Sequence, residues 1–300
     1  MLILMEGPLE GAASPPNVVA PRGFDRQGLM AAAQALRHRV HVIPPGGALS
    51  AAEPALKGGD FQWGVLYGSA FSPERYQRLH DEARALNITL LNDVAQHRDA
   101  EELDRTVALL DGLTARTEVV KSVGEVPTAL ARVRLPVFIR GAVSSAKELG
   151  WKACVADTVA EAQTLVTKLL ALGDYSRGRA VLREVLPLRR IDKLHQGFPL
   201  SREYRLFVLD ADVLAMGPYW VAEDPFGGLT ERDEREIRAL AHEVAKRTKV
   251  PWLAVDVGQL ESGEWKVIET GDPACTELVA VNPRDLLGAL ANGLEQRAGC

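Results

Sequence analysis

The stretch Trp252–Thr270, with the sequence WLAVDVGQLESGEWKVIET, predicts two neighbouring strands. Trp252–Val257 and Trp265–Thr270 are short apolar runs rich in Val, Ile and Trp, as is typical of strands. Between them lies the turn-forming segment Glu261-Ser262-Gly263. The two runs are therefore expected to pair as a hairpin-like unit.

A carboxylate interrupts each of these apolar runs, Asp256 in the first and Glu269 in the second, and Asp272 follows shortly after. An unpaired carboxylate buried in a strand costs several kcal/mol, so each one needs a cationic partner. Two or three carboxylates at neighbouring strand ends suit a hard cation such as Mg²⁺. The alternative is that each carboxylate pairs with a nearby arginine in a structural salt bridge, and the residues alone leave both open.

Further strands and helices extend outward from this pair on both sides. They are the strands Glu203–Leu209 and Asp212–Trp220, the helix Glu231–Thr248 opened by a capping box of Thr230 and Asp233, and a last helix opened by Asn282 and Pro283.

The segment from residue 116 to 188 predicts an antiparallel α+β unit. Its expected elements are the strands Thr117–Lys121, Pro136–Arg140, Trp151–Val155 and Val181–Leu186 and the helix Thr158–Leu172. A charged amphipathic helix is expected just before it, over Asp99–Leu110.

The first part of the chain alternates short apolar runs with helical patterns, which predicts a small parallel α/β layer. The expected strands are Leu2–Met5, Val40–Ile43, Val65–Tyr67 and Ile88–Leu91, and the expected helices are Gln27–Leu36 and Pro73–Leu86, the second capped by Ser72. The chain thus divides into residues 1–115, 116–188 and 189–300.

The amino-acid composition argues against several classes of protein. The 300 residues carry a net charge of −5, which argues against a nucleic-acid binder. The mean hydropathy is −0.04 and no apolar run approaches the ~18 to 20 residues that a membrane span needs. Three cysteines without a CxxC argue against a disulfide framework. A cytoplasmic protein is therefore expected.

Several common catalytic motifs are absent from the sequence. There is no HExxH or other zinc spacing among the histidines, no GxSxG, no GxGxxG after the first strand and no Walker GxxxxGK[ST]. The remaining candidates are cations at or inside apolar strands. Arg140 ends one such strand and is followed by the Gly141–Ser145 loop and Lys147, a plausible phosphate cradle. Arg205 lies inside another apolar strand.

These pieces, in this order, resemble the ATP-grasp superfamily over nearly the whole chain. The segments that carry the resemblance are Leu91-Asn92 with the helix containing Asp104-Arg105, the strand ending in Arg140 with Ser144 and Ser145, the strand Leu182–Leu186, Glu203-Tyr204-Arg205, and Val255-Asp256 with Val267–Glu269. The fold that the resemblance implies is an α/β N-terminal (pre-ATP-grasp, Rossmann-like) domain followed by a two-lobed α+β ATP-grasp domain.

The resemblance also implies a site for ATP and Mg²⁺. By analogy, the nucleotide is held by Arg105, Arg140, Ser144, Ser145, Lys147, Glu184 and Leu186, the catalytic residues are Arg205, Lys147 and Arg140, and the metal ligands are Asp256, Glu269 and Asp272.

Two departures from the family pattern stand out. Arg105 and Arg140 take positions where many members carry lysine, which is similar to a clade distinguished by two arginines and one lysine. The usual Glu-x-Asn metal pair is Glu269-Thr270-Gly271 here, with Asp272 as the nearest substitute.

The activity implied by the resemblance is ATP-dependent ligation of a carboxylate to an amine through an acyl phosphate. The expected partners are a small-molecule or peptide carboxylate and an amine acceptor, with a homodimer as a possible assembly and no nucleic acid or membrane. Two alternatives stay open: an ATP-binding domain that senses or scaffolds without ligating, and a kinase-like enzyme of the same fold. Tyr219 and Trp220 could line the acceptor pocket or belong to the core.

Overall fold

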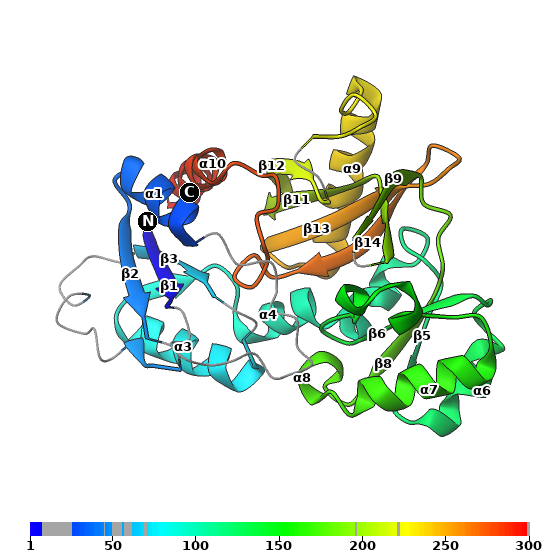
Figure 1. The fold of residues 1–300 in the computed structure, drawn as a ribbon. Coiled ribbons are helices and arrows are strands. Elements are labelled where there is room, and N and C mark those ends of the chain that lie inside the picture. The colour runs from blue at the N-terminus through cyan, green and yellow to red at the C-terminus, as the bar shows by residue number, and fades with distance from the viewer. Residues whose placement is uncertain are drawn as a thin grey trace.

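The computed structural model describes residues 1–7, 26–44, 46–49, 56, 62–68, 71–195, 197–220 and 223–298. Within these residues the chain forms three sheets of four strands each and one two-stranded sheet (Figure 1). No helix in the described ranges is both long and apolar enough to cross a membrane.

The N-terminal sheet is parallel, with the strand order β2-β1-β3-β4. Its elements are β1 (Leu2–Glu6), α1 (Arg26–Ala35), β2 (Arg39–Ile43), β3 (Gln62–Tyr67), α3 (Pro73–Ala85) and β4 (Ile88–Leu90). Ser72 caps α3 by accepting the backbone N–H of Arg75, as expected. The four predicted strands are therefore present in this sheet, whereas the description of this part as a Rossmann-like domain stays a prediction.

The middle sheet is antiparallel, with the order β5-β8-β6-β7. Its elements are β5 (Thr117–Val120), α6 (Val126–Leu130), β6 (Val137–Gly141), β7 (Val155–Ala156), α7 (Val159–Leu170), α8 (Gly173–Ser176) and β8 (Ala180–Glu184). Alternation along the strands turns Val137 and Ile139 toward α7, while Phe138 and Arg140 face the other way.

The strand predicted over Trp151–Val155 is wrong. Trp151–Ala153 forms a 3₁₀ turn, and only Val155 and Ala156 pair with β6. The turn starts at Gly150, whose φ of 89° lies in the left-handed region that glycine adopts at little cost. The backbone of Trp151 does not join the sheet, and its ring packs against Phe198.

The third sheet is antiparallel, with the order β12-β11-β13-β14. Its elements are β11 (Glu203–Leu209), β12 (Asp212–Pro218), α9 (Glu231–Thr248), β13 (Trp252–Gln259) and β14 (Trp265–Gly271). One face packs against α9, through Leu206 and Val208 of β11 and Leu253 and Val255 of β13. The strands predicted around the quoted stretch are thus confirmed. The opposite face of this sheet does not pack against α9.

The helix predicted over Asp99–Leu110 is wrong as a single element. It is α4 (Val94–Glu101), α5 (Leu103–Thr106) and a 3₁₀ turn over Val107–Leu110. The break is Glu102, with φ −93° and ψ 92°. Its fully buried carboxylate accepts hydrogen bonds of 2.6–3.0 Å from Arg98, Arg177 and Arg179. These bonds hold the backbone out of the helical conformation and tie α4 to the segment between α8 and β8.

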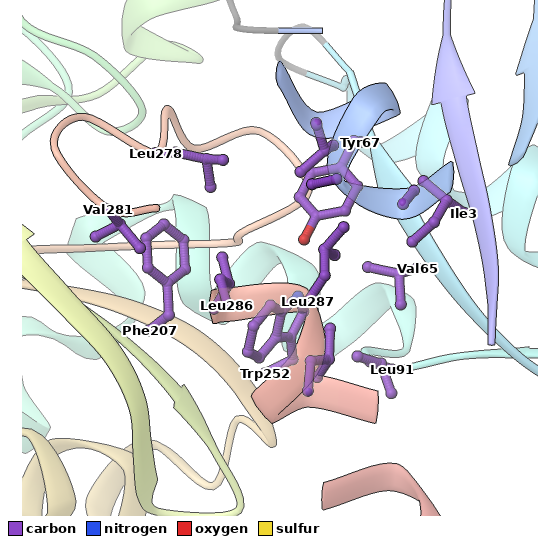
Figure 2. Packing of buried hydrophobic residues seen from close by; sticks show 14 of the residues in the cluster. Ile3, Val65, Tyr67, Leu91, Phe207, Trp252, Leu278, Val281, Leu286 and Leu287 are labelled. Carbon is purple, nitrogen blue, oxygen red and sulfur yellow. The ribbon is translucent and has the colours of Figure 1, made fainter. Parts of the chain in front are cut away.

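One core joins the first and last parts of the chain. Helix α10 (Pro283–Ala298), opened by Asn282 as expected, packs against α1 (Figure 1). Figure 2 shows Leu287 between Val65 of the parallel sheet and Trp252 of the third sheet, with Leu286 on the side of Phe207. The boundaries at residues 115 and 188 stay predictions.

Candidate active site

A pocket lies between the middle sheet and the third sheet, on the faces that α7 and α9 do not cover. It encloses about 860 Å³, including the space at its open mouth. The two-stranded sheet of β9 (Arg190–His195) and β10 (Phe198–Ser201) forms a further wall. The pocket follows from strand alternation, because each sheet presents its non-helix side to the other.

One end of the pocket is apolar. Phe138 from β6, Ile268 from β14 and the segment Val185–Leu186 after β8 line it. Ile268 reaches the pocket beside Glu269 because the pairing of β13 and β14 skips it, which makes it the extra residue of a bulge. Among the described residues, no acceptor takes the backbone N–H of Leu186, whose carbonyl accepts from Leu188. A flat ring with polar edges, such as a purine, fits this end.

Cations line the rest of the pocket. They are Arg140, Lys147 and Arg183, the last of which pairs in register with Phe138 and so lies next to the apolar end. Arg183 donates to the Ile268 carbonyl at 2.6 Å and to the Thr114 hydroxyl, and its buried Nε finds no hydrogen-bond partner among the residues that the structure describes. Burial, followed by the charge of Arg140, lowers the pKa of Arg183 to about 10. Like charges this close, with a donor left over, suit a polyanion such as a triphosphate.

Behind the cationic end, three charged residues form a row across the third sheet. Arg205, Asp256 and Glu269 are direct register partners on β11, β13 and β14. Arg205 makes two bonds of 2.7 Å to Asp256, and Arg140 pairs with Glu269 at 2.7 Å from the middle sheet. The row therefore places two carboxylates side by side with an arginine at each end, and Arg140 links the two sheets.

Two carboxylates in this row could hold a metal ion. Burial raises the pKa of Glu269, but Arg140 and Lys147 outweigh it and the net pKa is lowered, so the ionised form is favoured. Its side chain is 29% exposed and lines the pocket, while Asp256 is buried. In the described part of the chain, no group of three acidic, His or Cys side chains gathers as a metal cage. Two carboxylates with water and phosphate oxygens are nevertheless a normal set for Mg²⁺.

The structure brings most of the predicted site residues together. Six of them line the pocket: Arg140, Ser145, Lys147, Glu184, Leu186 and Glu269. Arg205 and Asp256 lie in the row behind, and Ser144 lies in the same loop without lining the pocket. The roles of these residues toward ATP stay predictions.

Two predicted residues lie elsewhere. Arg105 is on α5, outside the pocket lining, where it pairs with Asp99 at 2.6 Å. Asp272 lies three residues beyond Glu269, so the pleat directs it to the opposite face, where it bonds His97 at 2.9 Å and Asn92 at 3.0 Å. The expected grouping of Asp272 with Asp256 and Glu269 is not what the structure shows.

Among the pocket residues that sequence reasoning missed are two charged ones with several polar contacts, Arg183 and Glu203. Arg183 is a cation inside the apolar strand β8, which is the same signal that identified Arg140 and Arg205. Glu203 begins β11, is 8% exposed and accepts hydrogen bonds from the Ser201 hydroxyl and the Trp220 indole. No local pattern marked Glu203, because its partners come from β10 and the end of β12.

Comparisons with known proteins agree with this geometry. Residues 80–290 match a family model of the ATP-grasp domain, family 3 of the clade named for two arginines and one lysine, and the chain belongs to this family. The predicted resemblance is thus confirmed. No curated protein is significantly similar to the chain in sequence.

Solved structures are similar in fold at low identity. The RimK domain ATP-grasp protein from Sphaerobacter thermophilus DSM 20745 is 15% identical, with a TM-score of 0.57 over 98% of this chain and 95% of that one. The D-cycloserine synthetase DcsG is 16% identical, with a TM-score of 0.59 over 98% of this chain and 100% of that one. Both support an ATP-grasp fold with mixed α/β content.

Proposed function

We propose that the protein is an ATP-dependent ligase that joins a carboxylate to an amine through an acyl phosphate. The observation that carries the proposal is the pocket between the two sheets, apolar at one end and cationic at the other. Membership of the ATP-grasp family supports nucleotide binding there. The likeness to a synthetase supports a ligase over other uses of the fold.

The nucleotide would lie along the pocket. Its purine would meet Phe138, Ile268 and the backbone of Leu186, and its phosphates would meet Arg140 and Arg183. Mg·ATP supplies the phosphoryl group that activates the carboxylate. A loose phosphoryl-transfer transition state spreads negative charge over its oxygens, so fixed cations do most of the catalysis and no protein nucleophile is needed.

The charged row would hold the metal ion. Glu269 opens on the pocket and can bind a metal directly. Both oxygens of Asp256 are engaged by Arg205, yet a carboxylate has lone pairs to spare for a metal. We therefore assign to Arg205 the orientation of Asp256, in place of the direct phosphoryl contact expected from the sequence.

ADP formation from Mg·ATP tests the proposal. A panel of amino acids and short peptides would supply the carboxylate, with and without hydroxylamine as a simple amine. A ligase should release ADP in a manner that depends on both components and should form a hydroxamate. Carboxylate-dependent ADP release that hydroxylamine does not affect would indicate a kinase-like enzyme. Nucleotide binding without ADP release under any condition would indicate a binding domain.

A further inference from the structure

The ammonium group of Lys147 lies among aromatic rings. Its Nζ donates a 2.7 Å hydrogen bond to the Tyr219 hydroxyl. It lies 4.7 Å from the centroid of the Tyr219 ring and 5.0 Å from that of Trp220. The two rings meet edge to face, with centroids 4.8 Å apart. The Tyr219 hydroxyl binds the ammonium at the edge of its ring, and the Trp220 ring lies within the roughly 6 Å over which a ring quadrupole attracts a cation, so the pair forms part of an ammonium site.

The buried carboxylate of Glu203 lies next to these rings. One oxygen of Glu203 accepts the Trp220 indole N–H at 2.8 Å and the Ser201 hydroxyl, which fixes the orientation of the indole. Its other oxygen accepts no hydrogen bond from the described residues, and Glu203 lines the pocket. We call Tyr219, Trp220 and Glu203 the ammonium cage.

Lys147 is held in this cage by one directed hydrogen bond and by nearby charges, since, in spite of its burial, Tyr219, Glu269 and Glu203 raise the pKa of its ammonium. Its ammonium uses one of three donors, and within the described ranges no carboxylate forms an ion pair with it. Arg205, whose guanidinium also lies 4.7 Å from the Tyr219 ring, is by contrast locked by two bonds to Asp256. One cation beside the rings is therefore fixed by an ion pair, whereas the other is positioned by a single hydrogen bond and by charges that form no ion pair with it among the described residues.

Lys147 also lies within reach of a second environment. It belongs to the pocket lining together with Arg140, at the end where the proposed function requires phosphates. A flexible ammonium that is a compact point charge can serve either the rings or the phosphates, but not both at once.

We propose that the ammonium cage is the subsite for the amine acceptor, and that Lys147 stands in for the acceptor's ammonium group until bound phosphates draw it away. This inference rests on the proposed function, because it assigns the second substrate of that reaction. The side chain that fills the cage defines the ligand class: a primary amine on an unbranched alkyl chain, bound as the ammonium ion, which would pass one proton to the second oxygen of Glu203 before its nitrogen attacks the acyl phosphate.

The proposal predicts coupling between nucleotide and amine. Because Lys147 and the acceptor compete for one site, a nucleotide that removes Lys147 must raise the affinity for the amine. Without Lys147 the cage is open in either condition, so the coupling must disappear. Coupling of this origin differs from a general stabilisation by nucleotide, which would persist in the variant.

Titration with n-propylammonium, followed by ligand-observed NMR, tests this on the full chain. The wild type should bind it at least about tenfold more tightly with Mg²⁺ and a non-hydrolysable ATP analogue than without, since Lys147 then no longer occupies the cage. Lys147→Ala, which deletes a propylammonium-sized group, should bind it equally in both conditions. Lys152→Ala is the matched control, because Lys152 is exposed and pairs with Asp157, and it should behave as wild type. 1-Propanol, similar in shape without the charge, should bind weakly throughout.

Substitutions of the cage residues in the Lys147→Ala protein test whether these residues bind the amine. In the Lys147→Ala protein, Trp220→Leu or Glu203→Gln should weaken propylammonium binding at least about tenfold. Equal wild-type affinity with and without the analogue, coupling that survives in Lys147→Ala, or propanol binding as tight as the amine would each overturn the inference. Lys147→Ser replaces Lys147→Ala if the latter does not fold.

The same titrations separate the two proposals. If the analogue binds and propylammonium does not, the cage inference fails while the proposed function stands. If the analogue does not bind the wild type, the proposed function fails, and the cage is no longer an acceptor subsite even if Lys147→Ala binds the amine.

Discussion

Replacing Glu102 by glutamine keeps the shape of the side chain and removes the negative charge that Arg98, Arg177 and Arg179 share. Burial alone raises the pKa of Glu102, but the hydrogen bonds and charge of Arg98, with the charges of the other two arginines, lower it from 4.5 to about 2. At 1.36 kcal/mol per pKa unit, the folded state favours the ionised form by about 3 kcal/mol. The arginine side chains are 18–35% exposed, so screening reduces the expected loss to about 2 kcal/mol.

The pH dependence follows from the direction of this shift. A carboxyl group with a depressed folded-state pKa stabilises the protein fully above its unfolded pKa of about 4.5, and this contribution fades as the pH falls toward 2. Glu102→Gln lacks the titrating group. The difference in stability between wild type and variant should therefore be constant from pH 5 to about pH 8 and shrink below pH 4.5.

Urea denaturation at several pH values measures this difference. Glu236→Gln is the matched control, because Glu236 pairs with the exposed Arg232 on α9 and should lose less than about 0.5 kcal/mol. If Glu102→Gln costs no more than the control at pH 7, or if its cost does not shrink in acid, the buried three-arginine network does not stabilise the fold as argued.

Three further predictions concern the site and its scaffold. Asp256→Asn leaves the buried Arg205 without its anion and should lower the free energy of unfolding by about 3 kcal/mol in urea, with a cost near zero contradicting the ion-pair row. Gly141→Ala places a Cβ against the backbone carbonyl of Tyr175 and should destabilise strongly in thermal melts, whereas Gly124→Ala, with its nearest neighbour at 4.0 Å, should not. Arg183→Met should reduce the rise in melting temperature that Mg·ATP causes, and an unchanged rise would remove Arg183 from the phosphate site.

The elements that are predicted best from the sequence are those with local signals at both ends. Helix α9 spans Glu231–Thr248 as expected, and its capping box of Thr230 and Asp233 is formed. The break at Glu102 could not be predicted, because two of the arginines that bind its carboxylate come from far along the chain. Local amphipathicity was overridden there by tertiary contacts.

The candidate site was predicted in part for a similar reason. A charged residue inside an apolar strand needs a partner, and this rule singled out Asp256 and Glu269, which pair with Arg205 and Arg140, although the sequence did not identify those partners. Asp272 was grouped with them by its nearness in sequence, although the pleat sends it to the other face of β14. The partners of Glu203 are set by the packing of separate strands, which no spacing in the sequence records.

The shared core around α10 has a consequence for the order of folding during synthesis. Ile3 and Met5 of β1 belong to the same buried cluster as Leu290 and Leu294 of α10. Strand β1 leaves the ribosome long before α10. Its apolar side chains can therefore be buried by α10 only after that helix has been made. Contacts of such wide sequence separation form late. A chain without α10 would therefore leave Ile3 and Met5, which are made early, without the helix that buries them.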